Sequence, residues 1–424
     1  MAVGSGLSAQ LGIVTESTPG TPLAVTRFYE FDKETMSEKK HTVQGVGLRA
    51  GALTKRGSRR VQTAREAGGT VGFDIPTSGF GLTLQHMLGS FSTTATSLGG
   101  GLFQQIHNTG SLQGKAFTTQ IVKPDYTGVL TQNAYTYTGC KITDWTISGQ
   151  TESQLKVELT IDAIDQFTPS NSFAATTLAS GASAAATTVS STATITNGSY
   201  ILIAGNTPLQ NEVVAITGVS GAGPYTLTVS PALAYAHASG NVVSSPSAVN
   251  YGSPAALQAA SYTAGTSIFS YDATGSTLIA GGSTAVVSGV WTNTGGVAVG
   301  NVRSFTLKGT NPLKVDRFGI GSALKSEQIE NDYRSYSLEA EVEYSSPYFY
   351  QNYTADTALA LLLKFTAPGG IYLQFYMPVA FQNDGTDPEV SGPDILIPKL
   401  QLEVLDDGTN GAIQAVLVNT DAAV

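Results

Sequence analysis

Two stretches of the chain share one arrangement of apolar and polar positions. In each, apolar residues first alternate with polar ones, a bend follows, and a short apolar run comes last; the stretches are 70–91 and 336–367. Alternation predicts a strand with one buried face. The apolar runs place Leu84, Met87 and Leu88, and in the second stretch Leu359, Leu362 and Leu363, at the spacing of one helix face. We therefore predict a strand followed by a helix in both stretches.

The similarity continues on both sides of these stretches. Upstream, TRFYEF (26–31) matches VRSFTL (302–307), and downstream the segment 140–162 matches 398–420 without a gap, so that Lys141 meets Lys399. We infer a duplication, with copies near 20–166 and 296–424, each ending in a hairpin. The predicted fold class is mainly β: two tandem β-sandwich or barrel domains, each with one flanking helix, plus a small inserted all-β module. Two unrelated β-domains would also share alternation and turns.

The middle of the chain is almost free of charge. Between Gln166 and Val302 the only charged residues are Glu212 and Asp272. Alternating Ile, Val and Leu positions between turn signals predict an independent β-module, while the Ser/Thr/Ala-rich start of this region also fits a disordered segment. We divide the chain into a first domain with an N-terminal arm (1–169), the inserted module (170–247), and connecting strands with the second domain (248–424).

Composition and charge narrow the functional classes. Gly accounts for 47 of 424 residues, 12% of residues are charged, and the net charge is −9. An acidic chain does not suit a protein that binds nucleic acid by neutralising phosphates. A single cysteine, Cys140, excludes an intramolecular disulfide framework. The N-terminus lacks a signal-peptide pattern and no window is apolar for long enough to span a membrane, so we expect no membrane contact.

The sequence offers little chemistry. The four histidines lack the spacing of a zinc site, and the turn DDGTNG (406–411) lacks the full ligand pattern of a calcium loop and suits a hairpin better. No nucleophile elbow, phosphate-binding loop or metalloprotease motif is present. We expect neither catalytic activity nor a cofactor or bound metal.

Charge is nevertheless segregated along the chain. Residues 39–65 hold eight Lys/Arg and no Asp/Glu, while 327–343 hold six acids and one Arg. We predict that the basic segment docks on an acidic surface of an adjacent domain or ring, where complementary charge sets register and partner choice. Two unrelated solvated loops would show the same segregation. The candidate contact residues are Arg49, Lys55, Arg56, Arg59, Arg60, Glu327, Glu330 and Asp332.

Several of these blocks resemble one known family. The opening GSGLSAQLGIVTESTPGTPLAVTRFYEF, the block GNVRSFTLKGTNPLKVDRFGIGS, and SLEAEVEYSS followed by TALALLLKFTA are similar to the major tail tube protein of long, non-contractile-tailed bacteriophages. The resemblance implies a β-sandwich with a flanking helix, whose inner strands join around a ring into a β-lined channel. It also implies rings stacked on a tape-measure protein, tail terminator and tip proteins as partners, and genome DNA passing without specific binding.

Two copies in one chain change the expected ring. Most members resemble a single domain in hexameric rings, so two copies imply homotrimeric, pseudo-hexameric rings; six chains per ring is the alternative. We expect assembly in the host bacterial cytoplasm, a place in the virion tail, and the inserted module on the outer surface of the tube. The loop 89–113 has no counterpart in the second copy, and we predict that it folds against the next ring. A tail-tip or surface adhesin is the alternative function.

Overall fold

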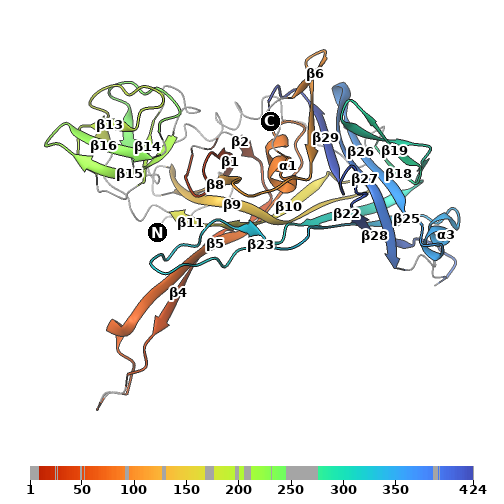
Figure 1. Ribbon diagram of the computed structural model, residues 1–424, viewed down its shortest axis with the longest axis horizontal. Coiled ribbons are helices and arrows are strands. Elements are labelled where there is room, and N and C mark those ends of the chain that lie inside the picture. The colour runs from red at the N-terminus through yellow and green to blue at the C-terminus, as the bar shows by residue number, and fades with distance from the viewer. Residues whose placement is uncertain are drawn as a thin grey trace.

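Mainly antiparallel strands build the protein (Figure 1). The computed structural model describes residues 9–23, 25, 27–47, 50–51, 53–90, 95–126, 130–167, 176–195, 200–204, 212–230, 232–244, 276–384, 390 and 392–423.

The first domain is a β-sandwich whose two sheets share one long strand. Its elements are β1 (Gln10–Glu16), β2 (Arg27–Tyr29), β3 (Lys33–Glu34), β4 (Ser37–Gln44), β5 (Arg60–Asp74), α1 (Gly81–Leu88), β6 (Thr96–Gly99), β7 (Leu102–Asn108), β8 (Ala116–Tyr126), β9 (Leu130–Gln150), β10 (Lys156–Ala163) and β11 (Asp165–Phe167). The first half of β9 pairs with β8 and β11, and its second half pairs with β10. β9 therefore passes from one sheet into the other.

The second domain repeats this design. Its elements are β18 (Thr277–Ala280), β19 (Ser283–Val287), β20 (Val290–Thr294), β21 (Val297–Ala298), β22 (Val302–Thr310), β23 (Leu313–Lys314), β24 (Ile329–Glu330), β25 (Ser335–Val342), α3 (Tyr348–Thr354), β26 (Leu359–Ala367), β27 (Ile371–Asp384), β28 (Lys399–Leu405) and β29 (Gln414–Asn419). Here β27 takes the part of β9, because it pairs with β26 and β29 at its start and with β28 at its end.

The strand pairings match element by element. The counterparts are β1 and β18, β2 and β21, β3 and β22, β5 and β25, β8 and β26, β9 and β27, β10 and β28, and β11 and β29. The register agrees too: Asp165 lies opposite Thr138 as Gln414 lies opposite Tyr376. α1 follows β5 as α3 follows β25, so the helices correspond as well.

One hydrophobic core runs through both domains. Residues of the first domain such as Phe73, Met87 and Trp145 belong to the same buried cluster as Leu338 and Phe375 of the second. Burial of such a cluster is the main favourable contribution to folding. The two domains therefore form one packed body.

The inserted segment forms a separate small barrel. Its strands are β12 (Thr176–Thr177), β13 (Thr188–Ser191), β14 (Tyr200–Ile203), β15 (Glu212–Ser220), β16 (Tyr225–Ser230) and β17 (Val242–Ser244), paired in the order β12-β17-β14-β15-β16-β13. A bridge between Leu178 and Ser191 brings the two ends of this sheet together. The barrel has its own buried cluster, which includes Ile201, Val214 and Leu227.

The predicted helix in the second copy is wrong. Leu359, Leu362 and Leu363 lie in strand β26, and the helix of this copy is α3, immediately before it. β26 is buried on both faces along most of its length, which produces a continuous apolar run instead of alternation. Such a run has no period that distinguishes a strand from a helix.

The gapless match of the closing segments is also wrong. Lys399 begins β28 and lies opposite Glu341, as Lys156 at the start of β10 lies opposite Asp74; Lys141 lies further back, in β9. The turn at 406–411 joins β28 to β29, which lie one after the other along the same edge of β27 and form no hairpin. Apolar and polar residues alternate in the same way in every half-buried strand, so this pattern does not show which strand of one copy corresponds to which strand of the other.

The described part of the loop 89–113 packs within its own chain, and its contact with the next ring stays a prediction. In its described part, β6 pairs with β7, and β7 pairs with β29 of the second domain. His107 and Ala415 lie opposite each other in this pairing. The loop therefore joins the two domains.

Candidate assembly surfaces

One continuous antiparallel sheet, eight strands wide, crosses both domains. Its strand order is β3–β4, β5, β10, β9, β22, β25, β28 and β27, with β3 and β4 in succession along β5. The pairing of β9 with β22 joins the domains, with Ser304 opposite Gln150 and Thr310 opposite Asp144. Alternate residues point to opposite faces of a sheet. One face lies on the core, and the other is polar and turned to solvent.

The polar face carries more carboxylates than ammonium groups. Its acids are Asp74, Asp144, Glu158, Glu339, Glu341 and Glu403, and its lysines are Lys33, Lys156, Lys308 and Lys399. Each of these lysines is paired with a carboxylate: Lys33 with Glu158 at 2.8 Å, Lys156 with Asp32 at 2.6 Å, Lys399 with Glu341 at 3.0 Å, and Lys308 with Glu339. These acids outnumber these lysines, and the four lysines are already neutralised within the chain.

Both ends of this sheet have an open edge. β26 pairs with β27 only as far as Ala380, so among the described residues no strand pairs with Phe381–Asn383 on the side away from β28. At the other end, β3 and β4 pair with β5 alone within the described chain. Open edges are templates for pairing with another chain.

Buried polar contacts fasten the two domains beside the β9–β22 joint. The side chain of Lys141 is 1% exposed, and its ammonium group donates to the Glu327 carboxylate (2.6 Å) and to the carbonyl oxygens of Leu112 (2.8 Å) and Gln328 (2.7 Å). Burial lowers the pKa of Lys141, and the Glu327 carboxylate opposes that shift. A buried ammonium with all of its donors used holds one geometry.

Helix α1 is closed at its C-terminus by the second domain. Arg334 donates to the carbonyl oxygen of Leu88 (2.7 Å), and Asn311 donates to that of Met87 (3.1 Å). Arg334 is itself held by the Glu330 carboxylate, with 2.9 Å from Nε to Oε1. These contacts satisfy carbonyl groups that a helix end otherwise leaves without partners.

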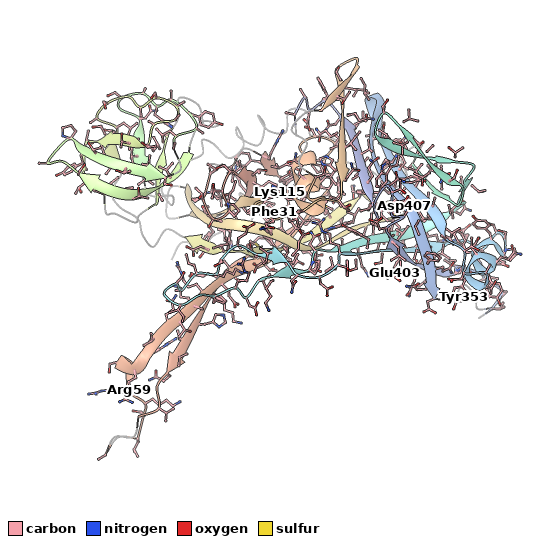
Figure 2. The ribbon with its side chains drawn as sticks, viewed as in Figure 1. Phe31, Arg59, Lys115, Tyr353, Glu403 and Asp407 are labelled. Atoms are coloured by element: carbon pink, nitrogen blue, oxygen red, sulfur yellow. The ribbon has the colours of Figure 1, made fainter. Side chains whose placement is uncertain are left out.

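The basic segment forms a long two-stranded arm. β4 pairs with the first half of β5, and the pair extends well away from the first domain, with Arg59 near its far end (Figure 2). Lys55, Arg56, Arg59 and Arg60 are exposed, and within the described residues none of them forms an ion pair. The far part of the arm also exposes apolar residues: Val43, Val46, Leu53 and Val61. Exposed apolar side chains beside unpaired cations suit a contact surface.

The predicted acidic partners lie elsewhere. Glu327 and Glu330 are bound to Lys141 and Arg334 within the chain, whereas Asp332 is exposed; Arg49 lies outside the described residues. The structure does not bring the arm and these acids together in one chain. Sequence reasoning missed the open strand edges, which carry no residue signature because they depend on pairing between distant strands.

Fold and surfaces together are those of a structural β-protein with tandem sandwich domains. Within the described part of the chain no cluster of three or more His, Cys, Asp or Glu side chains could hold a metal ion. None of the described helices is long and apolar enough to cross a membrane.

Comparison with known proteins gives the family. The model of the phage tail tube protein family matches residues 6–242 and again residues 236–404. The chain belongs to this family and is a structural component of a bacteriophage tail, which confirms the resemblance seen in the sequence. The two matched regions fit a double-domain tail tube protein. No curated protein matches the chain.

Proposed function

We propose that the chain assembles with copies of itself into stacked rings that form the tail tube, and that its eight-stranded sheet lines the channel. The observation that carries this is the sheet, which crosses both domains, turns one polar face to solvent and ends in an open edge on each side. Head-to-tail contact between two different edges closes into a ring. Genome DNA passes through the channel during ejection.

The charge of the polar face supports a channel for DNA. Its lysines are occupied by neighbouring carboxylates, so few cations remain to bind phosphates. A polar hollow of about 370 Å³ over β22, β25 and β28, lined by Lys308, Glu339 and Glu403 among others, belongs to the same face. An anionic wall repels the nucleic acid and lets it slide. The role is structural, without catalysis or a cofactor.

The joint inside the chain supplies a template for the joint between chains. Within a chain, β9 pairs with β22. The counterpart of β9 in the second domain is β27, and the counterpart of β22 in the first domain is β3 with the residues that follow it. The open edge of β27 would therefore pair with residues 35–37 of the next copy. Carrying the register over places Phe381 opposite Ser37. With two domains per chain, three chains make a pseudo-hexameric ring.

The remaining parts have proposed places outside the channel. The arm, with Arg49, Lys55, Arg56, Arg59 and Arg60, docks on an acidic surface of an adjacent ring, for which exposed Asp332 is a candidate. The barrel within segment 170–247 lies on the outer surface, between domains that span 1–169 and 248–424. The channel encloses the tape-measure protein, and terminator and tip proteins close its ends. Rings assemble in the host cytoplasm.

A disulfide ladder tests the joint and the ring size together. Phe381→Cys and Ser37→Cys in one chain place the two thiols at opposite ends of its sheet, so only neighbouring copies can bridge them. Opposite residues in an antiparallel pair lie about 4.5–5.5 Å apart, within disulfide reach. After oxidation of assembled tubes, we expect a covalent ladder on a denaturing gel that ends at three chains.

A register-shifted pair is the control. Phe381→Cys with Thr35→Cys lies one diagonal step away, about 7–8 Å apart, and should cross-link poorly. Cys140 is fully buried and should not contribute. A ladder ending at six chains would give six chains per ring, and tubes without any ladder would exclude this joint. Discrete particles that never stack would favour the adhesin function.

A further inference from the structure

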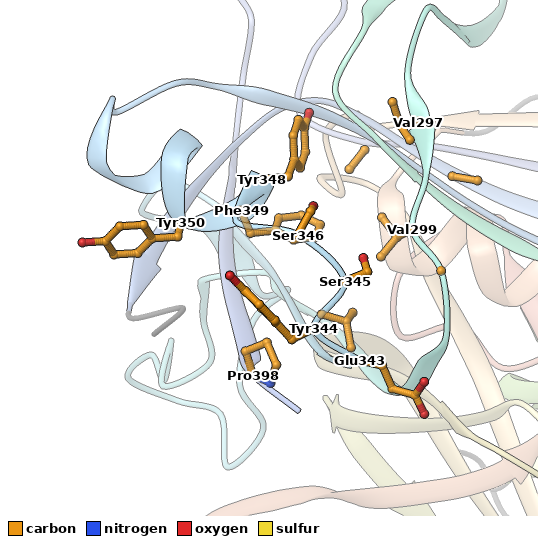
Figure 3. Close-up of a pocket in the computed structure, with 14 residues that line it drawn as sticks. Val297, Val299, Glu343, Tyr344, Ser345, Ser346, Tyr348, Phe349, Tyr350 and Pro398 are labelled. Atoms are coloured by element: carbon orange, nitrogen blue, oxygen red, sulfur yellow. The ribbon is translucent and has the colours of Figure 1, made fainter. Parts of the chain in front are cut away.

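The second domain has an open hollow at the base of α3. Its volume is about 160 Å³, and its walls come from the linker between β21 and β22, the residues after β25, and α3. Figure 3 shows Val297 and Val299 on one side, with Tyr348 and Phe349 on the other. Tyr344, which is 40% exposed, also lines the hollow.

The corresponding place in the first domain is filled by the chain itself. The C-terminal segment crosses it: the Asp421 carboxylate accepts from the Ser78 hydroxyl (2.8 Å) and the Gly79 N–H (2.6 Å), and Arg27 donates to the carbonyl oxygen of Ala423 (3.5 Å). Asp74 and Glu341 occupy matching rungs, so Ser78 and Gly79 correspond to Ser345 and Ser346 of the hollow. Every residue of α1 is buried, and none of α3 is.

The pseudo-symmetry of the two domains suggests an occupant for the hollow of the second domain. Residues 421–423 follow β29, and β11 is the counterpart of β29 in the first domain. By sequence count, residues 421–423 follow Gln414 as residues 172–174 follow its counterpart Asp165; residues 172–174 lie outside the described part of the chain. Within a chain, the segment that follows the second domain covers the hollow of the first domain. In a ring, the first domain of the next copy would lie beside the second domain in the same way, and the segment that follows it would cover the hollow of the second domain. We propose that the hollow receives segment 168–174 of a neighbouring copy; this rests on the ring proposed above.

The chemistry of the two sites fits their different occupants. Arg27 lies opposite Ile13 in the first domain. The counterpart of Arg27 in the second domain is Val299, whose N–H donates to the carbonyl oxygen of Leu278. The second domain therefore has an apolar side chain where the first has a guanidinium group. Segment 168–174, TPSNSFA, has no charged residue and carries one aromatic, Phe173. An apolar cavity of about 150 Å³ can take one aromatic ring. Tyrosine and phenylalanine walls favour such a contact.

Photo-cross-linking in assembled tubes tests the proposal. A benzoylphenylalanine replaces Tyr344 in the full chain, and chains of heavy and light isotope composition are mixed before assembly. The control places the same group at Tyr353, which lies on α3 outside the hollow and is 39% exposed, against 40% for Tyr344. We expect the Tyr344 probe, and not the Tyr353 probe, to give heavy–light peptides that contain 168–174.

The alternatives give different peptides. Tubes in which the Tyr344 probe links to the arm, or only within its own chain, would overturn this proposal and leave the tube function intact. Failure to form any tube would overturn the tube function and this proposal with it. As a second measurement, Phe173→Asp should lower the inter-copy yield at least fivefold, and Phe173→Leu should preserve most of it; equal yields would count against the contact.

Discussion

The contact between the two domains depends on the side chain of Lys141. Replacing it by Met leaves the Glu327 carboxylate, whose side chain is 26% exposed, without its cation and frees two carbonyl groups. Removing one partner of a buried ion pair costs about 3–5 kcal/mol. We expect Lys141→Met to lower the free energy of unfolding by about 3 kcal/mol, since Glu327 keeps some contact with water. Urea denaturation of the unassembled chain measures this.

Lys156 offers a matched control on the same sheet. It pairs with Asp32 and Asp74, but its side chain is 51% exposed. Exposed pairs contribute about 0–1 kcal/mol, so Lys156→Met should stay within that range. Equal losses in the two variants would show that burial of Lys141 contributes little to holding the domains together.

At the scale of elements, the sequence predicted the first helix and the β-rich fold. It failed at α3 because this helix is short, rich in Tyr and Phe, and has no buried residue, so no apolar stripe reveals it. It failed at β26 because burial on both faces removes the alternation. The charge of the arm was readable from composition. The partner of Glu327 was not, because Lys141 lies 186 residues away in the chain.

The β9–β22 joint depends on a glycine. A Cβ at Gly309 would lie 2.2 Å from the ring of Trp145, which is 1% exposed and lies opposite in β9. Overpacking a core costs about 1–3 kcal/mol. We expect Gly309→Ala to lower the free energy of unfolding by about 2 kcal/mol and to weaken the joint, measured by denaturation and by hydrogen exchange of β22 amides. Gly300→Ala, where nothing lies within 4 Å, is the control and should be near neutral.

The arm gives a prediction about stacking. Its exposed cations have no partner among the described residues of their own chain, so reversing them should leave the ring intact and impair contact between rings. We expect Arg59→Glu with Arg60→Glu to shorten the tubes severalfold in electron micrographs without changing the ladder of cross-linked chains. Adding Asp332→Lys should restore part of the length; single and double variants that fail equally would reject Asp332 as the partner.

At the scale of the whole molecule, the two joints of the proposed ring differ. Within a chain, two strand pairings connect the domains, β9 with β22 and β7 with β29. β7 lies in the long loop after α1, whereas the connection between α3 and β26 is short and holds no such strand. The joint between chains therefore lacks the second pairing. The joint inside the chain is therefore the stronger one. Rings should dissociate into whole chains, and the two domains of a chain should unfold together.

The inserted barrel stands outside this arrangement. Its strands pair only with one another among the described residues, and its buried cluster is separate from the core of the two domains. Replacing Thr176–Ser244 by a short Gly/Ser linker, while keeping 168–174, should leave ring formation and the lumen unchanged and reduce only the outer diameter of the tube. Cryo-electron microscopy of tubes from both chains measures this. The isolated barrel should unfold cooperatively on its own. A truncated chain that stays folded by circular dichroism but forms no tube, or a tube with an altered lumen, would show that the barrel takes part in the ring.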